Sequence, residues 1–103
     1  MERVYEGTEL KLNVSIDKIA GYTMDDYDFI AEFYCSQNRK LRLEKSALIR
    51  TDAANYSAVV DTRSLGVGVL KCKITAFLPD ADCADGVRTE VCLMDTGINI
   101  VVG

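Results

Sequence analysis

Strict alternation of apolar and polar residues is the feature that most limits what this chain can fold into. In the stretch VLKCKITAFL, residues 69–78, every second position from Leu70 onwards is apolar, with lysine or threonine between the first of them. Successive side chains of a β-strand point to opposite faces, so a period of two gives one apolar and one polar face. The pattern predicts a half-buried strand, and TELKLNVSID, residues 8–17, predicts a second one.

Similar stretches recur along the chain about every dozen residues, separated by turn-forming residues. Further strand candidates cover residues 27–35, 41–45, 47–52, 54–62, 87–94 and 98–102. About seven or eight short strands of this kind are typical of an antiparallel β-sandwich, and a β-barrel is the structural alternative. No segment shows a sustained helical period, so we expect an all-β fold in a single domain over residues 1–103.

The composition supports a folded domain and argues against several partners. The 103 residues are 49% hydrophobic and 27% charged, with a net charge of −4. A nucleic-acid-binding protein needs a basic face that neutralises phosphates, so we expect no nucleic acid partner. The N-terminus MERVYEGTEL lacks the apolar run of a signal peptide, and no stretch is long and apolar enough to span a membrane. We therefore expect synthesis and retention in a cytoplasm, without a membrane partner.

Cysteine and histidine usage argues against a metal site and against an enzyme. The four cysteines, Cys35, Cys72, Cys83 and Cys92, contain no C-x-x-C pair, and the chain has no histidine. This spacing fits no zinc site, and a Ser–His or Cys–His nucleophile requires histidine. Cys35 and Cys72 lie at inward-facing positions, where buried thiols are expected and a disulfide is the alternative. We predict no metal, no cofactor and no catalytic residue.

The acidic stretch PDADCADG, residues 79–86, has two interpretations. A calcium loop of the EF-hand type needs oxygen ligands at fixed spacing. Asp80 and Asp82 match the first two ligands, but Ala84 stands at the third and the closing glutamate is missing. Because Asp-Gly is a strong tight-turn pair, a hairpin turn between two strands explains the same residues better. Arg88, just beyond the turn, is expected to pair with one of the aspartates.

Two other segments are candidate binding surfaces. One loop gathers side chains that can stack on a sugar face and accept hydrogen bonds from its hydroxyls: Tyr22, Asp25, Asp26, Tyr27 and Asp28. The terminal stretch GINIVVG, residues 97–103, is apolar on both faces, so it would be sticky if exposed. Either it is a central strand buried on both sides, or a partner subunit covers it; the candidate interface residues are Ile98, Ile100, Val101 and Val102. Ile30 and Tyr34 lie at outward positions of residues 27–35 and raise the same question.

The second half of the chain resembles a known group of domains. Residues 61–100 contain L-G-x-G, a strand, P-D-x-D-x-x-D-G-x-R, a strand, and T-G-I. This skeleton is similar to that of small immunoglobulin-like domains in virion proteins of tailed phages and related prophages. In the first half, GTELKLNVSID followed by MDDYDFIAEFY fits the same opening, so the resemblance covers nearly the whole chain. The matching positions are Leu65, Gly66, Gly68, Asp80, Asp82, Asp85, Gly86, Arg88, Thr96, Gly97 and Ile98.

The resemblance implies an immunoglobulin-like β-sandwich with a structural role in a virion, and it implies no catalytic residue. Such domains begin baseplate and tail-fibre proteins, or stand alone as head fibres and capsid decorations. The expected partners are other virion proteins of the capsid or of the tail and baseplate, and further copies of the chain in a homodimer or homotrimer. A module that binds carbohydrate on the host surface is the alternative. We expect the protein in the virion, after synthesis in the host cytoplasm without a signal peptide.

Two departures bear on this resemblance. Relatives that anchor fibres continue into a long distal region, whereas this sequence ends at Gly103. The initial Met1 and the apolar end favour a complete small virion protein over an excised domain. Immunoglobulin domains proper also pack a tryptophan on an inter-sheet disulfide. The chain has no tryptophan, so the likeness is one of sandwich architecture.

Overall fold

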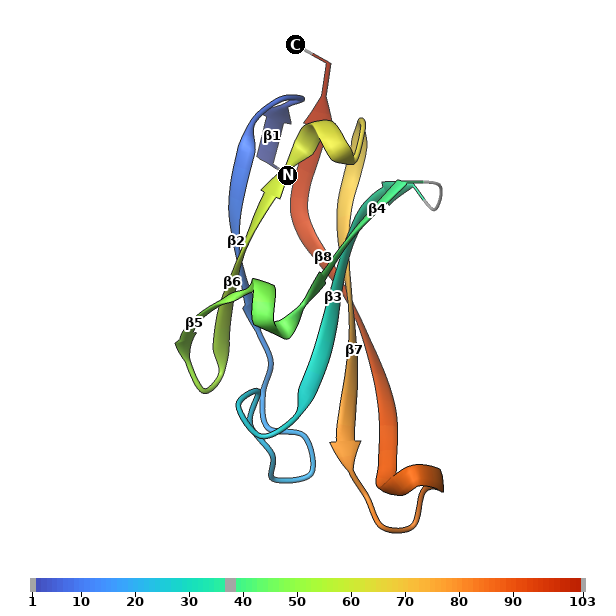
Figure 1. The fold of residues 1–103 in the computed structure, drawn as a ribbon. Coiled ribbons are helices and arrows are strands. Elements are labelled where there is room, and N and C mark those ends of the chain that lie inside the picture. Colours follow the sequence, from blue (N-terminus) through green and yellow to red (C-terminus); the bar gives the residue numbers. More distant parts are fainter. Residues whose placement is uncertain (1, 37–38, 103) are drawn as a thin grey trace.

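The computed structural model describes residues 2–36 and 39–102 of the chain. In these residues, eight strands form two sheets that pack face to face (Figure 1). The large sheet has five strands in the order β1-β8-β7-β3-β4, and the small sheet has three in the order β2-β6-β5. The prediction of an all-β sandwich with about seven or eight strands is confirmed.

The two sheets draw their strands from both halves of the chain. The large sheet contains β1 (Glu2–Tyr5), β3 (Asp28–Ser36), β4 (Arg39–Glu44), β7 (Gly68–Pro79) and β8 (Val87–Val101). The small sheet contains β2 (Glu9–Ser15), β5 (Ile49–Asp52) and β6 (Asn55–Asp61). Short 3₁₀ helices lie between strands at η1 (Lys45–Ala47), η2 (Thr62–Ser64) and η3 (Ala84–Gly86). Within the described ranges, no helix has the length and apolar character needed to cross a membrane.

Strands β7 and β8 form a hairpin and are the two longest strands of the large sheet. They have 12 and 15 residues and extend past the end of the small sheet (Figure 1). They pair from Pro79 opposite Val87 to Gly68 opposite Ile100, so the predicted hairpin turn is confirmed. The Nη1 atom of Arg88 lies 3.5 Å from Oδ2 of Asp80 across this turn, as the sequence predicts.

The core lies between the sheets and consists of the side chains that alternation places inward. On the large sheet these include Phe29, Ala31, Phe33, Leu70, Ile74, Ala76 and Leu78. On the small sheet they include Val14, Tyr56, Ala58 and Val60. Full burial of a large apolar side chain contributes roughly 1.5–3 kcal/mol relative to exposure, so this inner face supplies most of the stability.

The four cysteines are free thiols, so the predicted thiols, and not the alternative disulfide, are found. Cys72 is buried in the core, and burial raises the pKa of its thiol to about 12. Cys35 is only half-buried, because it lies near the end of β3 where the strand pairing with β4 becomes irregular. Its Sγ donates to the carbonyl oxygen of Gly68 at 3.5 Å.

The first strand is the part of the fold that the sequence pattern did not predict. β1 pairs in parallel with β8, from Glu2 opposite Ile98 to Tyr5 opposite Val101. Only Val4 of its four residues is buried, so no alternation is visible in the sequence. β1 covers the free edge of β8, whose backbone N–H and C=O groups would otherwise lack strand partners.

Candidate docking surface

The outer face of the large sheet is the side turned away from the small sheet. Four rows of side chains that include a residue of β3 cross this face, namely Asp28–Phe77–Thr89, Glu44–Ile30–Thr75–Val91, Arg42–Glu32–Lys73–Leu93 and Lys40–Tyr34–Lys71–Asp95. A shorter row, Pro79–Val87, lies beyond the first of these at the hairpin turn. The residues between them on the same strands, such as Phe29 and Ile74, point into the core. Neighbours within a row are in contact distance, because adjacent strands lie roughly 4.7–4.9 Å apart.

The centre of this face is apolar. Val91 and Leu93 keep 54% and 70% of their surface exposed. Ile30, Thr75 and Phe77, on the neighbouring strands, are half-buried. Directly opposed and diagonal neighbours on adjacent strands can touch, so the four apolar side chains and the methyl group of Thr75 form one continuous apolar patch. A continuous exposed patch on a sheet indicates an interaction surface, whereas a single exposed apolar residue does not.

The charges around the apolar patch differ between its two ends. The two rows at the hairpin end carry Asp28 and Glu44 as their charged residues. The two rows at the other end carry Arg42, Lys73, Lys40 and Lys71 against Glu32 and Asp95. The outer face therefore has an acidic end and a basic end, and the direction from one to the other runs along the strands.

A shallow hollow lies at the basic end. It has a volume of about 230 Å³ and is lined by Tyr34, Lys71, Leu93, Met94 and Asp95. Tyr34 is buried although it points outward, and the Nζ of Lys40 lies 5.3 Å from the centre of its ring. This cation–π contact holds the ammonium group of Lys40 over the tyrosine ring, and Tyr34 lines the hollow beside the exposed side chain of Leu93.

Only part of the terminal segment is accessible to a partner subunit. Ile98 and Ile100 are buried in the chain's own core, so these two candidate interface residues are corrected to core residues. The two isoleucines are buried because they occupy alternate positions of β8 that point inward, whereas their neighbours along the strand point outward. Val101 is half-buried opposite Tyr5 of β1, and Val102 remains 74% exposed. The end of β8 is therefore buried on its inner face and partly exposed on its outer face.

Asp25, from the predicted sugar-binding loop, is engaged within the chain. It accepts hydrogen bonds from Nε and Nη2 of Arg50 at 2.9 and 2.8 Å, and from the hydroxyl of Tyr56. The hydrogen bond from Arg50, followed by the one from Tyr56, lowers the pKa of Asp25 to about 2. Burial, together with the bond to Asp25, raises the pKa of Tyr56 to about 12. Arg50 and Tyr56 belong to the small sheet, so this cluster ties the loop to that sheet.

The other loop residues divide into local structure and free surface. Asp26 accepts from the backbone N–H and the hydroxyl of Thr23, and these bonds lower its pKa. Tyr27 is buried, and its ring meets the edge of Phe29 at a centroid distance of 6.0 Å. Tyr22 is half-buried against the core, and Asp28 is exposed. The five residues therefore do not converge on one binding site.

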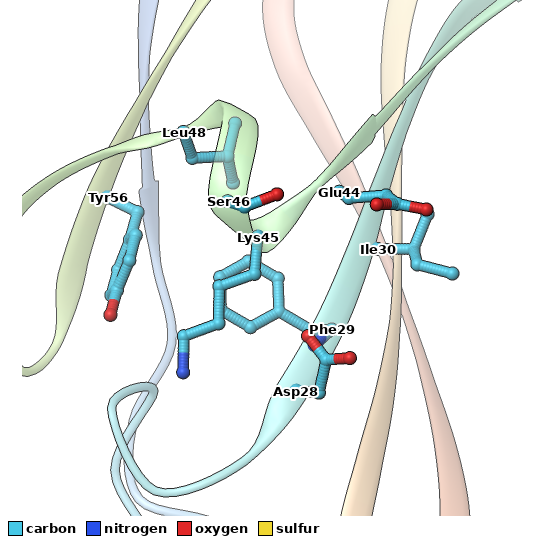
Figure 2. Close-up of a pocket in the computed structure, with 8 residues that line it drawn as sticks. All are labelled: Asp28, Phe29, Ile30, Glu44, Lys45, Ser46, Leu48 and Tyr56. Atoms are coloured by element: carbon cyan, nitrogen blue, oxygen red, sulfur yellow. The ribbon is translucent and has the colours of Figure 1, made fainter.

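Another hollow lies where β3 begins beside η1, with a volume of about 560 Å³ (Figure 2). Figure 2 shows Lys45 reaching along the ring of Phe29 towards Tyr56. The Nζ of Lys45 donates to the backbone oxygens of Tyr27 at 2.8 Å and Asp25 at 3.3 Å. It also lies 5.7 Å from the centre of the Phe29 ring. The lysine is thus engaged in holding the loop, and the charged residues that also line the hollow are Asp28 and Glu44, which are both exposed.

The acidic turn after β7 is shaped by its own hydrogen bonds. The backbone N–H of Asp82 donates to Oδ1 of Asp80 at 3.0 Å, and the backbone N–H of Asp80 donates to the carbonyl of Gly86 at 2.9 Å. Asp85 adopts a positive φ of 59°, a conformation that aspartate tolerates in turns. Across the described residues, no group of three or more Cys, Asp or Glu side chains is arranged to hold a metal ion.

Comparison with known proteins gives no match to this chain. No family model matches the sequence, no curated protein matches it, and no solved structure matches the fold.

Proposed function

We propose that this chain is a non-enzymatic structural component of a phage virion, either a head fibre or decoration protein, or a domain that anchors a tail or baseplate fibre. It acts by docking on other virion proteins and by associating with copies of itself. The observation that carries the docking role is the apolar patch on the outer face, with Val91 and Leu93 at its centre. Removing such a patch from water is the main driving force of most protein association.

The virion assignment rests on the sequence resemblance in residues 61–100. The matching positions shape strands and turns. Gly68 has a φ of 131°, and a Cβ atom there would lie 3.3 Å from Cβ of Cys35. The hydroxyl of Thr96 donates to the carbonyl of Leu70 at 2.7 Å where β7 and β8 change register. Residues that fix the backbone are compatible with a structural role, although a sandwich fold by itself serves many functions.

Carbohydrate recognition is the second class of function considered from the sequence. Three of the five loop residues are already engaged inside the chain, namely Asp25, Asp26 and Tyr27. A sugar site would have to be built from Tyr22 and Asp28 alone, so we do not extend the proposal to it. A signal on a glycan array that disappears in Tyr22→Ala would reverse this choice.

Two experiments test the proposal. The first follows the chain with an antibody through density-gradient purification of phage particles, and the chain is expected to band with intact particles. Its presence only among soluble proteins would contradict the virion role. The second is light scattering of the purified chain over a range of concentrations, in which the average mass is expected to rise above that of one chain. A single-chain mass at every concentration would remove self-association from the proposal.

A further inference from the structure

Part of one edge of the large sheet has no strand beside it. β1 pairs with β8 only from Ile98 to Val101, so among the described residues the edge of β8 over residues 87–97 has no strand partner. Figure 1 shows this part of β8 on the outer side of the hairpin. A free edge presents a row of backbone N–H and C=O groups, and the structure that matches such a row is the edge of another strand.

The other edge strands of the two sheets carry features that oppose such pairing. β4 has the highly charged sequence RKLRLE, β2 carries Glu9 and Lys11, and β1 and β5 have only four residues each. Charged side chains and short length are common devices that keep edges from pairing. The free edge of β8 differs, because its residues 91–94, VCLM, form an uncharged apolar run between Glu90 and Asp95. It is therefore the edge of this fold best suited to accept a strand.

Two copies of this edge match each other in length. When a strand pairs with its own copy about a two-fold axis, the two strands run antiparallel and the axis is perpendicular to the sheet. The free edge runs from Val87 to Gly97, so its midpoint is Cys92. Pairing centred on Cys92 uses the whole free edge and ends just before Ile98, where β1 begins. A partner strand shifted in one direction would run into β1, and one shifted in the other would leave part of the edge unpaired.

This register also brings the two apolar runs together. Val91 of one copy lies opposite Leu93 of the partner subunit, and Cys92 lies opposite its own copy. Directly opposed side chains of antiparallel strands have Cβ atoms roughly 4.5–5.5 Å apart, so these residues are in contact across the junction.

No like charges are directly opposed in this register. The charged residues of the free edge, Arg88, Glu90 and Asp95, lie opposite Thr96, Met94 and Thr89 of the partner subunit. A register centred on Glu90 would instead place two glutamates directly opposite each other, and opposed like charges destabilise a strand pair. The length of the edge, its apolar run and its charges thus agree on one register.

We propose that two copies of this chain join their β8 strands over residues 87–97, antiparallel about a two-fold axis at Cys92, so that the two large sheets become one continuous sheet. The occupant of the free edge is thus a second copy of the chain. The inference rests on the proposed self-association and adds to it the strand, the register and the symmetry. The outer faces of both large sheets lie on the same side, so the apolar patches around Val91 and Leu93 meet across the junction and form one larger docking surface.

A short bis-maleimide reagent that bridges two thiols tests the register. Cys92 lies at the axis, whereas Cys83 lies before the start of β8 and far from the axis, and both are half-buried. At concentrations where light scattering gives a mass of two chains, we expect a crosslink between two copies of Cys92 and none between two copies of Cys83. Mass spectrometry of the linked peptides identifies the cysteines. A dimeric chain whose Cys92 carries the reagent on one arm only would contradict this pairing.

Charges placed opposite Asp95 test the same register without touching the core. Thr89 and Asp95 are both exposed. Thr89→Lys creates two attractive pairs in the dimer and is expected to lower the dissociation constant about threefold or more, whereas Thr89→Asp creates two repulsive pairs and should raise it by a similar factor. Added salt should reduce the difference between the two variants. The control is Thr51→Asp, an exposed position on the edge strand β5, which should change the dissociation constant less than about twofold. Equal dissociation constants for the two Thr89 variants would overturn the register.

The outcomes separate this inference from the proposed function. A mass limited to two chains, the Cys92 crosslink and opposite effects of the two Thr89 variants support the edge dimer. Self-association without the Cys92 crosslink overturns the edge dimer but leaves self-association standing. A mass above two chains also overturns it, because a two-fold pair uses the free edge of both copies. In purified particles, a crosslink from Cys92 to another virion protein would mean that a strand of that protein, and not a second copy, occupies the edge. A single-chain mass at all concentrations removes both the dimer and self-association, and banding with particles then still decides the virion role.

Discussion

The two faces of the large sheet are built from the same strands but differ in burial. On β3, Phe33 points inward and is 1% exposed, while Ile30 points outward and is only half-buried. On β8, Ile100 is buried by the small sheet, while Leu93 is 70% exposed. The inner face has a cover supplied by the same chain, and among the described residues nothing covers the outer one. An apolar side chain on the first face stabilises the fold, and on the second it is available for binding.

The largest difference between the faces is expected in core truncations. Phe33→Ala should lower the free energy of unfolding by about 3–5 kcal/mol, because it removes buried surface and leaves a cavity. Ile30→Ala, on the same strand, should cost about 1 kcal/mol or less, because its side chain already contacts water. Urea unfolding of both variants measures the difference. Equal losses would mean that the two faces are equally covered in solution.

Thiol labelling measures how well the inner face is sealed. Cys72 should react with a thiol reagent only after unfolding, because it is buried and its thiol has a pKa raised to about 12. Cys83 and Cys92 are half-buried and should react in the folded protein. Mass spectrometry of labelled peptides with and without urea distinguishes them. Rapid native labelling of Cys72 would show that the sheets separate readily.

The hydrogen bonds from Arg50 and Tyr56 to Asp25 make the stability of the fold depend on pH. The pKa of Asp25 is about 2 in the folded chain, below the 3.8 of an unperturbed aspartate, so the folded state favours the carboxylate. The stability that this adds is present above about pH 4 and is lost as the pH falls towards 2. Asp25→Asn should therefore flatten part of the acid dependence of the unfolding midpoint. A variant with the unaltered acid profile would exclude a contribution from the cluster.

The smallest effect on stability is expected from the outer face. Leu93→Lys should change the free energy of unfolding by no more than about 0.5 kcal/mol, measured at low concentration where association does not contribute. The long aliphatic stem of lysine can still lie along the sheet. A loss as large as that of a core truncation would show that Leu93 is packed against something within its own chain.

The fold could be predicted from the sequence because each strand buries one face. Alternation in residues 69–78 identified the inward side chains of β7, and the Asp-Gly turn before Val87 identified the hairpin. β1 was missed because four residues with one buried side chain carry no pattern. The outward direction of Val91 and Leu93 was also missed, since Cys92 and Met94 between them are apolar too.

The details of the candidate sites depended on contacts that a sequence does not reveal. Asp25 was expected to face a ligand, but it is held by Arg50 and Tyr56, which lie 25 and 31 residues away along the chain. The terminal segment is apolar on both parities, so the sequence could not tell which residues point inward. The sequence did contain one indication that the outer face is apolar, because Ile30 lies at an outward position of the predicted strand 27–35.

The most direct test of this account compares two substitutions at the two candidate interfaces. Leu93, on the outer face, is 70% exposed, and Val102, in the terminal segment, is 74% exposed. The measurement is the concentration-dependent mass of Leu93→Lys and Val102→Lys beside the unmodified chain. We predict that the unmodified chain and Val102→Lys associate alike, while Leu93→Lys remains a single chain. Dissociation by Val102→Lys with intact association of Leu93→Lys would contradict it and place the interface at the terminal segment.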